Sequence, residues 1–440
     1  MYSKAFKRPP RISDETDADG NQDDQTPVVV ADLSALNKKL EAEYSKIGKN
    51  LKNPVKTPIK TIEASSLTVQ VFRTFDEAEK LWLRFEKDAA CFIYQQFSFC
   101  RTWYETVGKQ RGTNLHIVVV QDADDETLML VPLCLIKNHF GTTVSFIGNG
   151  MADYLAPLVR NDFAASLEDS SFDGLWEKIL GTIEVKIDMV WLDRQPVNII
   201  GISNPISQLA HFNDANSAHA LNFPQATDWA ECARMVRSNK TVKKIERRLR
   251  QLAKQGPVEL IEITDAGKRQ QHMNELLALK ISNLNDAGTL HRMDTPEMAA
   301  FYHDLVDTPS MQKNLCHFEL RCDGHLVASV LGLVHHKTFY YQICAFNRQE
   351  FSQYSPGLLL LYQLFDWCFA RGLKRFDMTI GDEGYKSDWS NETTQMVTVA
   401  IAYSNLGRLS YVINRTLLEV KTTIKSSPLL RKLTLRLLGN

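Results

Sequence analysis

The sequence of 440 residues lacks several patterns that would assign it to a class at once. It contains no run of about 18 apolar residues, so we expect no membrane-spanning helix. Its basic first residues are not followed by an apolar segment, which argues against a secretory signal and predicts a cytoplasmic protein. Lysine and arginine total 51 against 52 acidic residues, a net charge of -1. The whole protein therefore has no field that attracts nucleic acid or anionic lipid, and nucleic acid is not expected as a partner.

Cysteine is present, but without the spacing of a metal or redox motif. None of the eight cysteines forms a Cys-x-x-Cys pair, and most have apolar neighbours, as buried reduced thiols do. Cys316, His317, Cys322 and His325 have the residue types of a zinc site. They flank a turn and alternate between strand faces, however, so the sequence predicts no metal.

The N-terminal residues, 1–66, differ in composition from the rest. An acidic stretch without aromatic residues, 13–25, precedes a lysine-rich segment with two prolines. Such a chain cannot bury enough apolar surface to offset the entropy of ordering. We expect a disordered segment, with a transient helix at 33–47.

From residue 68 onward, the same order of elements appears twice: two helices, three strands, a helix and a strand. The first set is expected at 75–89, 98–107, 115–121, 127–137, 142–147, 173–186 and 188–193. The second set is expected at 268–286, 295–306, 315–321, 325–334, 338–346, 357–371 and 375–380. This repetition predicts two copies of one α/β domain, at 68–225 and 257–405.

A basic segment, 226–256, connects the two predicted domains. Arg234–Lys254 contains nine lysines and arginines and a single acid. Apolar residues with 3-4-3 spacing predict an amphipathic helix with a basic outer face, which ends at Gly256-Pro257. The helix could pack on both domains, or it could bind anions such as phosphates, RNA or an acidic substrate.

The last segment, 406–440, is both apolar and basic, and Pro428 divides it into two expected helices. Such a segment could lie on an anionic membrane, cover a polysaccharide-synthesis partner, or pack on the C-terminal domain. The first alternative would place the protein at the periphery of the inner membrane.

A candidate donor site lies at the start of the helix that is expected after the third strand of the second copy. Ser355-Pro356-Gly357 precedes Leu358, the first residue of an apolar helical run. Free N–H groups and the helix dipole at such a start suit phosphate or pyrophosphate. The same residues are also ordinary at a helix start.

The densest cluster of candidate catalytic residues follows the last strand pattern. A buried strand with Asp377 leads into a turn that carries Asp382, Glu383, Tyr385 and Lys386. The carboxyl ends of strands are where ligands bind in α/β sheets. A carboxylate and a phenol could act as base and acid, and a lysine could hold a phosphate or stabilise an oxyanion.

The first copy lacks this sequence at the equivalent place, 191–196, which predicts one chemical site in two domains. It contains instead a glycine-containing turn, Gly148–Tyr154, that presents an acid and a phenol, Asp153 and Tyr154. These two residues could contact substrate, or the segment could be a simple turn.

The aromatic-rich stretch Phe92–Trp103 resembles the first-domain signature of the GNAT-like acetyltransferases associated with bacterial cellulose biosynthesis, the CelD type. Asp153-Tyr154, Ser355–Gly357, Phe376-Asp377 and Gly381–Lys386 recur in the same order in that family, so the resemblance spans about 68–400. It implies tandem GNAT folds similar to the FemAB aminoacyltransferases. It also implies substrate contacts by Trp103, Asp153 and Tyr154, and acyl transfer from acetyl-CoA or another acyl-CoA.

One departure from the GNAT pattern leaves the donor open. The pyrophosphate loop Q/R-x-x-G-x-G/A is absent before Leu358, so an aminoacyl-tRNA remains an alternative donor. The leading hypothesis is an N- or O-acyltransferase that acts on a sugar, glycan precursor or peptide in exopolysaccharide or cellulose biosynthesis. The alternatives are a noncatalytic accessory module of polysaccharide synthesis and an aminoacyl-tRNA-dependent transferase.

Overall fold

The computed structural model describes residues 64–166, 171–287 and 293–426, all within the compact unit 59–440. The segment predicted to be disordered lies outside the described residues, except for a 3₁₀ turn at Ala64–Ser66. The second of the two helices expected in 406–440 also lies outside them. Within the described ranges, no helix is both long enough and apolar enough to cross a membrane.

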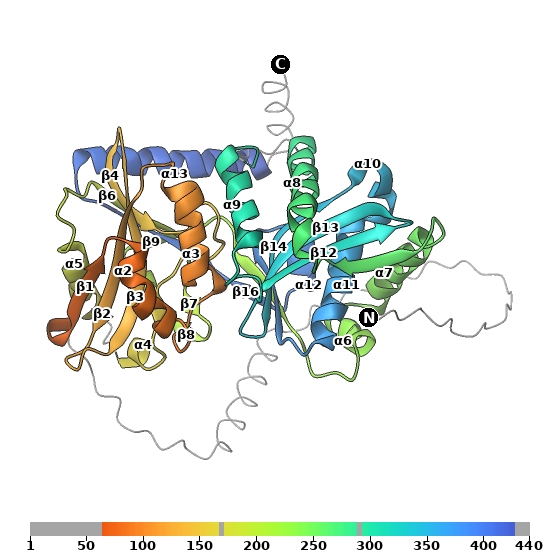
Figure 1. The fold of residues 1–440 in the computed structure, drawn as a ribbon, viewed down its shortest axis with the longest axis horizontal. Helices are drawn as coiled ribbons and strands as arrows, with labels where there is room; N and C mark the ends of the chain where they lie inside the picture. The colour runs from red at the N-terminus through yellow and green to blue at the C-terminus, as the bar shows by residue number, and fades with distance from the viewer. Residues whose placement is uncertain (1–63, 167–170, 288–292, 427–440) are drawn as a thin grey trace, which may run out of the picture. The chain divides into compact units, whose positions relative to one another are not determined.

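The first sheet is mixed, and its central strands are almost entirely buried (Figure 1). In spatial order, it consists of β1 (Thr68–Phe72), β2 (Asn114–Gln121), β3 (Thr127–Asn138), β4 (Gly141–Phe146), β6 (Met189–Pro196), β17 (Met396–Ala402) and β9 (His211–Asn213), with β5 (Leu158–Val159) on β3. Its helices are α2 (Phe75–Phe85), α3 (Phe97–Trp103), which continues as a π turn (Tyr104–Gly108), α5 (Ser171–Leu180) and α13 (Asn405–Ser426).

The second sheet is also mixed and has helices on both faces. In spatial order, it consists of β11 (Val258–Glu262), β12 (Leu315–Cys322), β13 (His325–His335), β14 (Thr338–Phe346), β15 (Arg375–Ile380), β10 (Ala218–Asn222) and β16 (Glu392–Thr394). Its helices are α6 (Trp229–Val236), α7 (Asn239–Leu252), α8 (Arg269–Asp286), α9 (Pro296–Asp307), α11 (Pro356–Ala370) and α12 (Gly384–Trp389).

Local sequence explains where individual helices begin. The Thr74 hydroxyl accepts a hydrogen bond from the Glu77 N–H, and the Glu77 carboxylate accepts one from the Thr74 N–H, both at 3.2 Å. This capping box starts α2, whose buried side chains Phe75, Ala78, Trp82 and Phe85 follow helical spacing. The chain therefore enters the first core at a defined point.

The predicted repetition of elements is confirmed. Each half has the order strand, two helices, three antiparallel strands, helix, strand, and the last strand pairs in parallel with the third of those antiparallel strands. The first half has the short strand β5 in addition. The fold is α/β and tandem, as expected. The helix expected at 173–186 ends at Leu180, because the chain turns at Gly181.

The halves exchange strands, which the sequence did not indicate. β17, which follows the second half in sequence, pairs with β6 of the first sheet, and β10, which precedes the second half, pairs with β15 of the second. The domain limits at 225 and 405 stay a prediction, but strand pairing crosses both of them. Each sheet is completed by a strand from beyond its own predicted domain.

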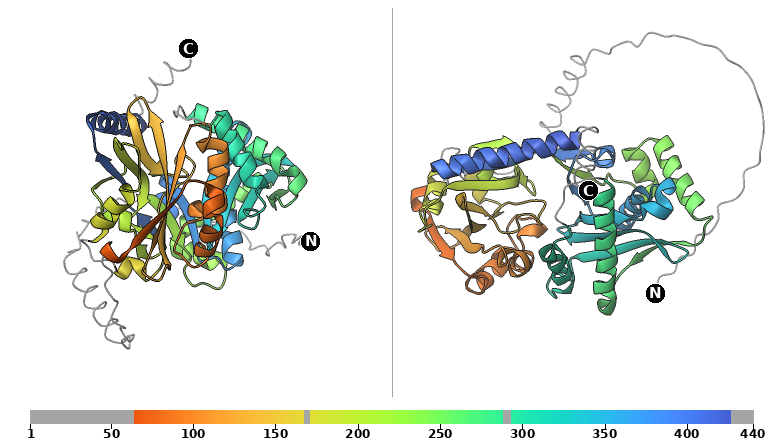
Figure 2. Two further views of the ribbon diagram at one scale, coloured as in Figure 1. Left: turned by 60° about the vertical axis from the view of Figure 1, so that its left-hand side comes forward. Right: turned by 90° about the horizontal axis from the view of Figure 1, so that it is seen from above.

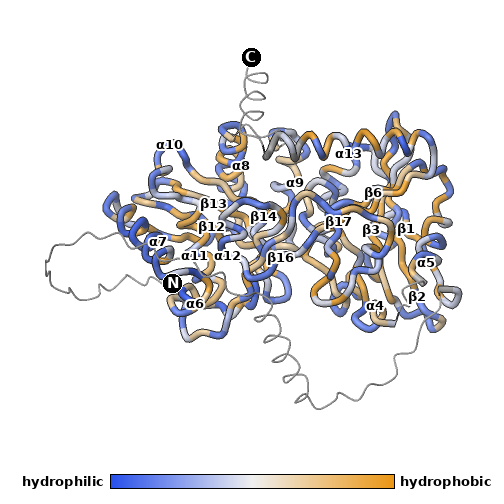
Figure 3. The backbone as a smooth tube through the Cα atoms, turned by 180° about the vertical axis from the view of Figure 1, so that it is seen from behind, coloured by the Kyte–Doolittle hydropathy of each residue, from blue (hydrophilic) through white to orange (hydrophobic). Residues whose placement is uncertain are grey.

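The single helix expected over Arg234–Lys254 was wrong, because two helices occupy this range. Arg237 is extended, and the Ser238 hydroxyl accepts a hydrogen bond from the Thr241 N–H, so a new helix begins there. The amphipathic pattern holds within α7, whose Val242, Ile245 and Leu252 are buried and whose outer side is hydrophilic (Figure 3).

The hydrophobic core has two parts, one on each face of the second sheet. One cluster joins the first half to α8 and α9, and Phe99 of α3 packs on Phe301 of α9 with ring centroids 5.4 Å apart. The other cluster lies between the second sheet and helices α6, α7 and α11. A continuous core therefore connects the halves through α8 and α9.

The helix α13 packs only in part on the predicted C-terminal domain, 257–405. It lies against β17, the last strand within those limits, and against β6 and β4, which are β17's partners in the first sheet (Figure 2). A Cβ at Gly407 would lie only 1.8 Å from the Asp188 carbonyl oxygen, so the glycine permits the close approach.

Candidate active site

The candidate site lies where β14 and β15 separate. The two parallel strands pair only from Thr338–Tyr340 to Arg375–Asp377. Directly afterwards β14 carries a bulge, in which Tyr341 and Gln342 both stand opposite Gly332 of β13. A bulge bends its strand and redirects side chains, and here it turns Gln342 toward the first half.

A loop of the first half packs against this separation. Gln342 Nε2 donates to the Met151 carbonyl oxygen at 3.0 Å, and the Tyr154 hydroxyl donates to Asp377 Oδ1 at 2.8 Å. The rings of Tyr94 and Tyr154 both meet the Tyr340 ring, with centroids 5.8 and 6.5 Å away. Residues of both halves therefore build the site.

Asp377 is the buried anchor of this contact. Its side chain is 1% exposed and accepts hydrogen bonds from Tyr154, from the Thr379 N–H at 2.8 Å and from Arg375 Nη2 at 3.4 Å. Burial raises the pKa of the Asp377 carboxyl, and Arg375 opposes that rise. With these partners, Asp377 fixes the positions of the Tyr154 side chain and of the backbone at Thr379.

Thr379 has a φ of +60°, which is unusual for a β-branched residue. Its N–H nevertheless points at the Asp377 carboxylate, which holds the backbone in this conformation. Strained backbone of this kind is concentrated at functional sites. The strain marks the end of β15 as a specialised segment.

Asp153 is the carboxyl best placed for chemistry. Its side chain is 20% exposed, its Oδ1 lies 4.0 Å from Arg194 Nη1, and its Oδ2 accepts from the Tyr94 hydroxyl at 3.5 Å. Burial raises its pKa, while Arg194 and Lys386 attract the ionised form. A reachable carboxyl with a raised pKa between two cations suits a general base.

Lys386 is held rigidly beside Asp153. Its side chain is 7% exposed, and Nζ donates to the Ile380 carbonyl oxygen at 2.7 Å and lies 3.3 Å from Glu383 Oε2. Glu383 itself is half exposed. The turn therefore fixes an ammonium group at the end of β15, as its position in the sequence predicted.

The other predicted catalytic residues lie apart from Asp153. Asp382 is exposed, and its Oδ1 lies 3.1 Å from Nε2 of His219 on β10, whose Nδ1 contacts the Thr393 hydroxyl at 3.2 Å. Burial raises the pKa of Tyr385, which lies beside Cys344 of β14. Cys344 is the one cysteine of the eight that is not fully buried.

The helix α11 begins at Pro356, within one residue of the predicted start, and its role as a donor site stays a prediction. Ser355 has a φ of +57°, its carbonyl oxygen accepts from the Leu358 N–H at 3.0 Å, and Pro356 has no N–H. Gly357 supplies the first N–H of α11, and a Cβ there would lie 3.1 Å from the Phe346 ring. The basic helix α7 packs against α11 and the turn Ser352–Tyr354.

Trp103 is placed differently from the other predicted substrate contacts. It is 1% exposed, and its indole N–H donates to the Asn149 carbonyl oxygen at 3.1 Å. It therefore supports the turn that leads to Asp153 and Tyr154. Arg194, which the sequence analysis missed, donates to the Ala152 carbonyl oxygen at 2.6 Å and so braces the same turn.

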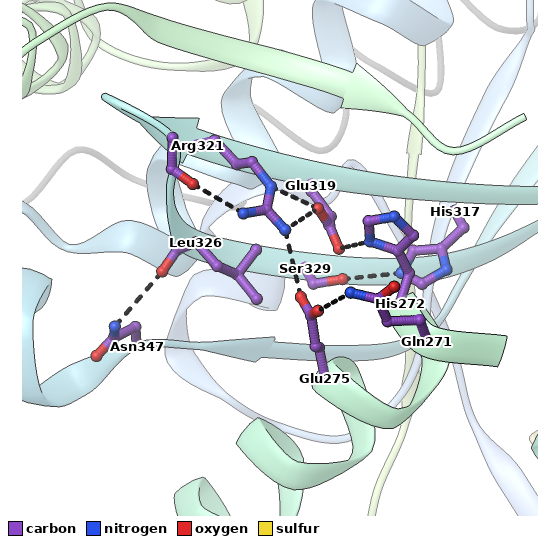
Figure 4. A network of polar contacts seen from close by, with 10 residues as sticks. Gln271, His272, Glu275, His317, Glu319, Arg321, Leu326, Ser329 and Asn347 are labelled. Carbon is purple, nitrogen blue, oxygen red and sulfur yellow. Dashed lines mark hydrogen bonds and ion pairs between the residues drawn. The ribbon is translucent and has the colours of Figure 1, made fainter. Parts of the chain in front are cut away.

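A second polar network links α8 to β12 (Figure 4). His272 Nδ1 lies 2.7 Å from Oε1 of the fully buried Glu319, and Arg321 binds Glu319 at 2.7 Å and Glu275 at 3.3 Å. His272, Glu275 and Glu319 are close enough to share a cation. The Arg321 guanidinium pairs with both carboxylates, so the network is an ion-pair cluster that links α8 to β12.

The chain was compared with protein families, curated proteins and solved structures. Residues 239–387 match the family model for an acetyltransferase (GNAT) domain. A search of curated proteins gave no match. Among solved structures, FemX is similar over 79% of this chain and 99% of its own, with 11% identity and a TM-score of 0.54. The FemX similarity, which covers both halves, shows the fold.

Two further structures are similar at a lower level. A conserved protein of unknown function from Bacteroides thetaiotaomicron has 13% identity and a TM-score of 0.48, over 76% of this chain and all of that chain. A tandem GNAT protein from the clavulanic acid biosynthesis pathway has 10% identity and a TM-score of 0.36, over 77% of this chain and 99% of that chain. The association with cellulose biosynthesis stays a prediction.

We predict that Tyr154→Phe lowers the free energy of unfolding by about 1–3 kcal/mol, because the buried Asp377 carboxyl loses a donor. Tyr94→Phe is the matched control: this phenol is equally buried, but its hydroxyl lies 3.5 Å from its partner. Urea unfolding of Tyr154→Phe, Asp377→Asn and the double variant should give a coupling of about 1 kcal/mol or more. A loss no larger than that of Tyr94→Phe would contradict the anchoring role.

Proposed function

We propose that the protein is an acyltransferase that moves an acyl group from acyl-CoA to an amine or hydroxyl of a sugar, glycan precursor or peptide. The observation that carries the proposal is Asp153, a reachable carboxyl held beside Lys386 where β14 and β15 separate. It lies against a segment that matches a GNAT acetyltransferase domain. The resemblance of the sequence to cellulose-associated acetyltransferases favours a saccharide acceptor.

Asp153 would accept the proton of the attacking amine or hydroxyl. Its raised pKa makes it a stronger base than an exposed aspartate, and the nearby cations favour its ionised form. The acceptor atom would attack the thioester carbon, the carbon–sulfur bond would break, and the thiolate would leave. The thiolate would then take up a proton from solvent, because Tyr385, the predicted acid, lies beside Cys344 and apart from Asp153.

The donor phosphates would lie at the start of α11. The helix dipole and the Gly357 N–H favour an anion there, and the exposed lysines and arginines of α7 lie on a helix packed against the same segment. This arrangement supports acyl-CoA. It equally supports aminoacyl-tRNA as a second candidate donor, because the exposed basic face of α7 is larger than a pyrophosphate requires.

We predict that Gly357→Asp weakens acetyl-CoA binding at least tenfold, because a carboxylate would stand beside the donor phosphates. Gly357→Asn is the matched control, since it adds the same volume near Phe346 without the charge. Calorimetry with acetyl-CoA, longer acyl-CoAs and aminoacyl-tRNA also identifies the donor. If the two variants bind acetyl-CoA with equal affinity, the donor phosphates do not lie at the start of α11. If the protein binds aminoacyl-tRNA and no acyl-CoA, the donor is aminoacyl-tRNA.

We predict that Asp153→Asn lowers kcat about 10²–10⁴-fold, the usual contribution of a general base. The wild-type rate should rise with pH through a pKa above that of an ordinary aspartate and then level off, because only the ionised carboxyl accepts a proton. An assay of free CoA thiol release, with aminosugars and peptides screened as acceptors, measures both the change in kcat and the pH dependence of the rate. Asp382→Asn, an exposed acid of the same region, should change kcat by less than threefold, and an Asp153→Asn variant as active as this control would exclude the base.

We further propose that the protein binds an anionic membrane surface through α13. Leu406, Leu409, Val412, Leu417 and Val420 are each between 46% and 58% exposed. At 100° per residue they occupy about 140° of the helix. Gly407, Ser410 and Asn414 form the side nearer the sheet, and Arg408 and Arg415 both lie along the opposite edge of the apolar stripe. A long helix with an outward apolar side and a basic edge is suited to interfacial binding.

We predict that Leu409→Ser with Val412→Ser lowers sedimentation with anionic vesicles at least tenfold, because two apolar side chains worth about 1.5–3 kcal/mol each no longer enter the interface. Met235→Ser with Ile200→Ser is the matched control, since these apolar residues are equally exposed elsewhere. Equal binding by both variants, or no binding by the wild type, would exclude the membrane role.

A further inference from the structure

A cavity of about 520 Å³ lies in the second half, away from the candidate active site. It is located where β11 ends and β12 begins, and Trp367 and Arg371 close it from the last turn of α11. The proposed donor position is at the other end of α11, about 22 Å away for a helix of 15 residues. None of the residues assigned to acyl transfer lines the cavity.

The charged residues of the cavity give it a positive excess. Arg269, Lys313 and Arg371 line it, against the single acid Glu262. Arg371 Nη2 lies 3.3 Å from Glu262 Oε2, and its guanidinium stacks 3.9 Å from the ring centroid of Trp367. Arg371 is thus oriented and neutralised, which leaves Arg269 and Lys313 without a counter-charge in the wall.

Two buried polar atoms of the lining have no hydrogen-bond partner among the described residues: Arg269 Nη1 and His317 Nδ1. An unsatisfied buried donor costs about 1–3 kcal/mol, so each is expected to meet a partner when the site is used. His317 is 5% exposed, and its Nε2 contacts the Ser329 hydroxyl at 3.0 Å (Figure 4).

His317 adds a donor without adding charge. Burial lowers its pKa to about 4, so the ring is neutral at pH 7. When Ser329 donates to Nε2, the ring proton resides on Nδ1, which then becomes a donor. The residues that line the cavity therefore include a guanidinium N–H and an imidazole N–H without partners, and both groups are suited to an oxygen anion.

The remaining wall is apolar, with Leu315, Leu331, Val334 and the face of Trp367. Cavities of about 300–1,000 Å³ with a few polar groups and apolar walls are typical small-molecule sites. We propose that this cavity binds a small amphiphilic anion, a carboxylate or phosphate monoester with an apolar body, whose head group contacts Arg269 and whose body lies on Trp367. The site is separate from the acyl-transfer site.

Calorimetry on the full chain tests the proposal with octanoate and hexyl phosphate as the two head groups. Octanol serves as the neutral probe and inorganic phosphate as the anion without a body. We expect saturable binding of at least one amphiphilic anion, at least tenfold weaker in Arg269→Gln. Lys268→Gln is the matched control: it removes the neighbouring charge of an exposed residue outside the cavity, and it should change the affinity less than twofold.

The result that overturns the proposal is specific. An anion site is excluded if octanol binds as tightly as octanoate, or if folded Arg269→Gln binds the anion with unchanged affinity. It is also excluded if the wild type binds no anion with a dissociation constant below about 5 mM, since 5 mM corresponds to a binding free energy of only about 3 kcal/mol. If Arg269→Gln does not fold, Lys313→Gln, at an exposed position of the cavity wall, replaces it. Acetyl-CoA affinity should be unchanged in either variant, so this proposal and the donor proposal fail independently.

Discussion

The burial of one carboxyl group, Asp377, determines much of the rest of this structure. A carboxyl that is 1% exposed is stable only if its oxygens are hydrogen-bonded, and one of its donors, the Tyr154 hydroxyl, comes from the other half of the chain. The residue before Tyr154 is Asp153, so the bond that satisfies Asp377 also places the candidate base. Arg194 and Trp103 hold the same turn from behind. The chemistry of the site therefore depends on the docking of the two halves, and this explains why neither half contains a complete site.

Much of the fold could be predicted from the sequence because local patterns specify it. In the second half, the expected strands at 315–321, 325–334 and 338–346 agree with β12, β13 and β14 within one residue at each end. Alternating apolar residues around a short turn define these elements without reference to the rest of the chain. The pairing partners of β10 and β17 could not be predicted in this way. Both segments have ordinary strand patterns, and no local feature indicates that each pairs with a strand of the distant sheet. The break at Ser238 was missed since the basic, amphipathic pattern on both sides hides a cap.

The candidate site could be predicted in part. Asp153, Tyr154 and Lys386 were found from residue type and position, and they lie together. Asp382 and Tyr385 were selected by the same argument, yet one faces His219 and the other Cys344. A turn of a few residues can point its side chains in several directions, and sequence spacing alone does not fix which. Arg194 and His219 were missed because they come from β6 and from the exchanged strand β10, which meet the site only after the sheets have formed.

The strand exchange explains why part of the site could be predicted from local sequence and part could not. Arg194 belongs to β6, whose neighbour β17 pairs with it from Met396 opposite Pro196 to Ala402 opposite Met189. Lys386 lies ten residues before Met396, on α12 between β15 and β16. The chain therefore runs directly from one cation beside Asp153 into the strand that supports the other. Because the pairing of β6 with β17 is antiparallel and extends along both strands, it limits how far the two cations can separate. We infer that the exchanged strand sets the charge on both sides of the candidate base, which two independent domains joined by a linker would not do.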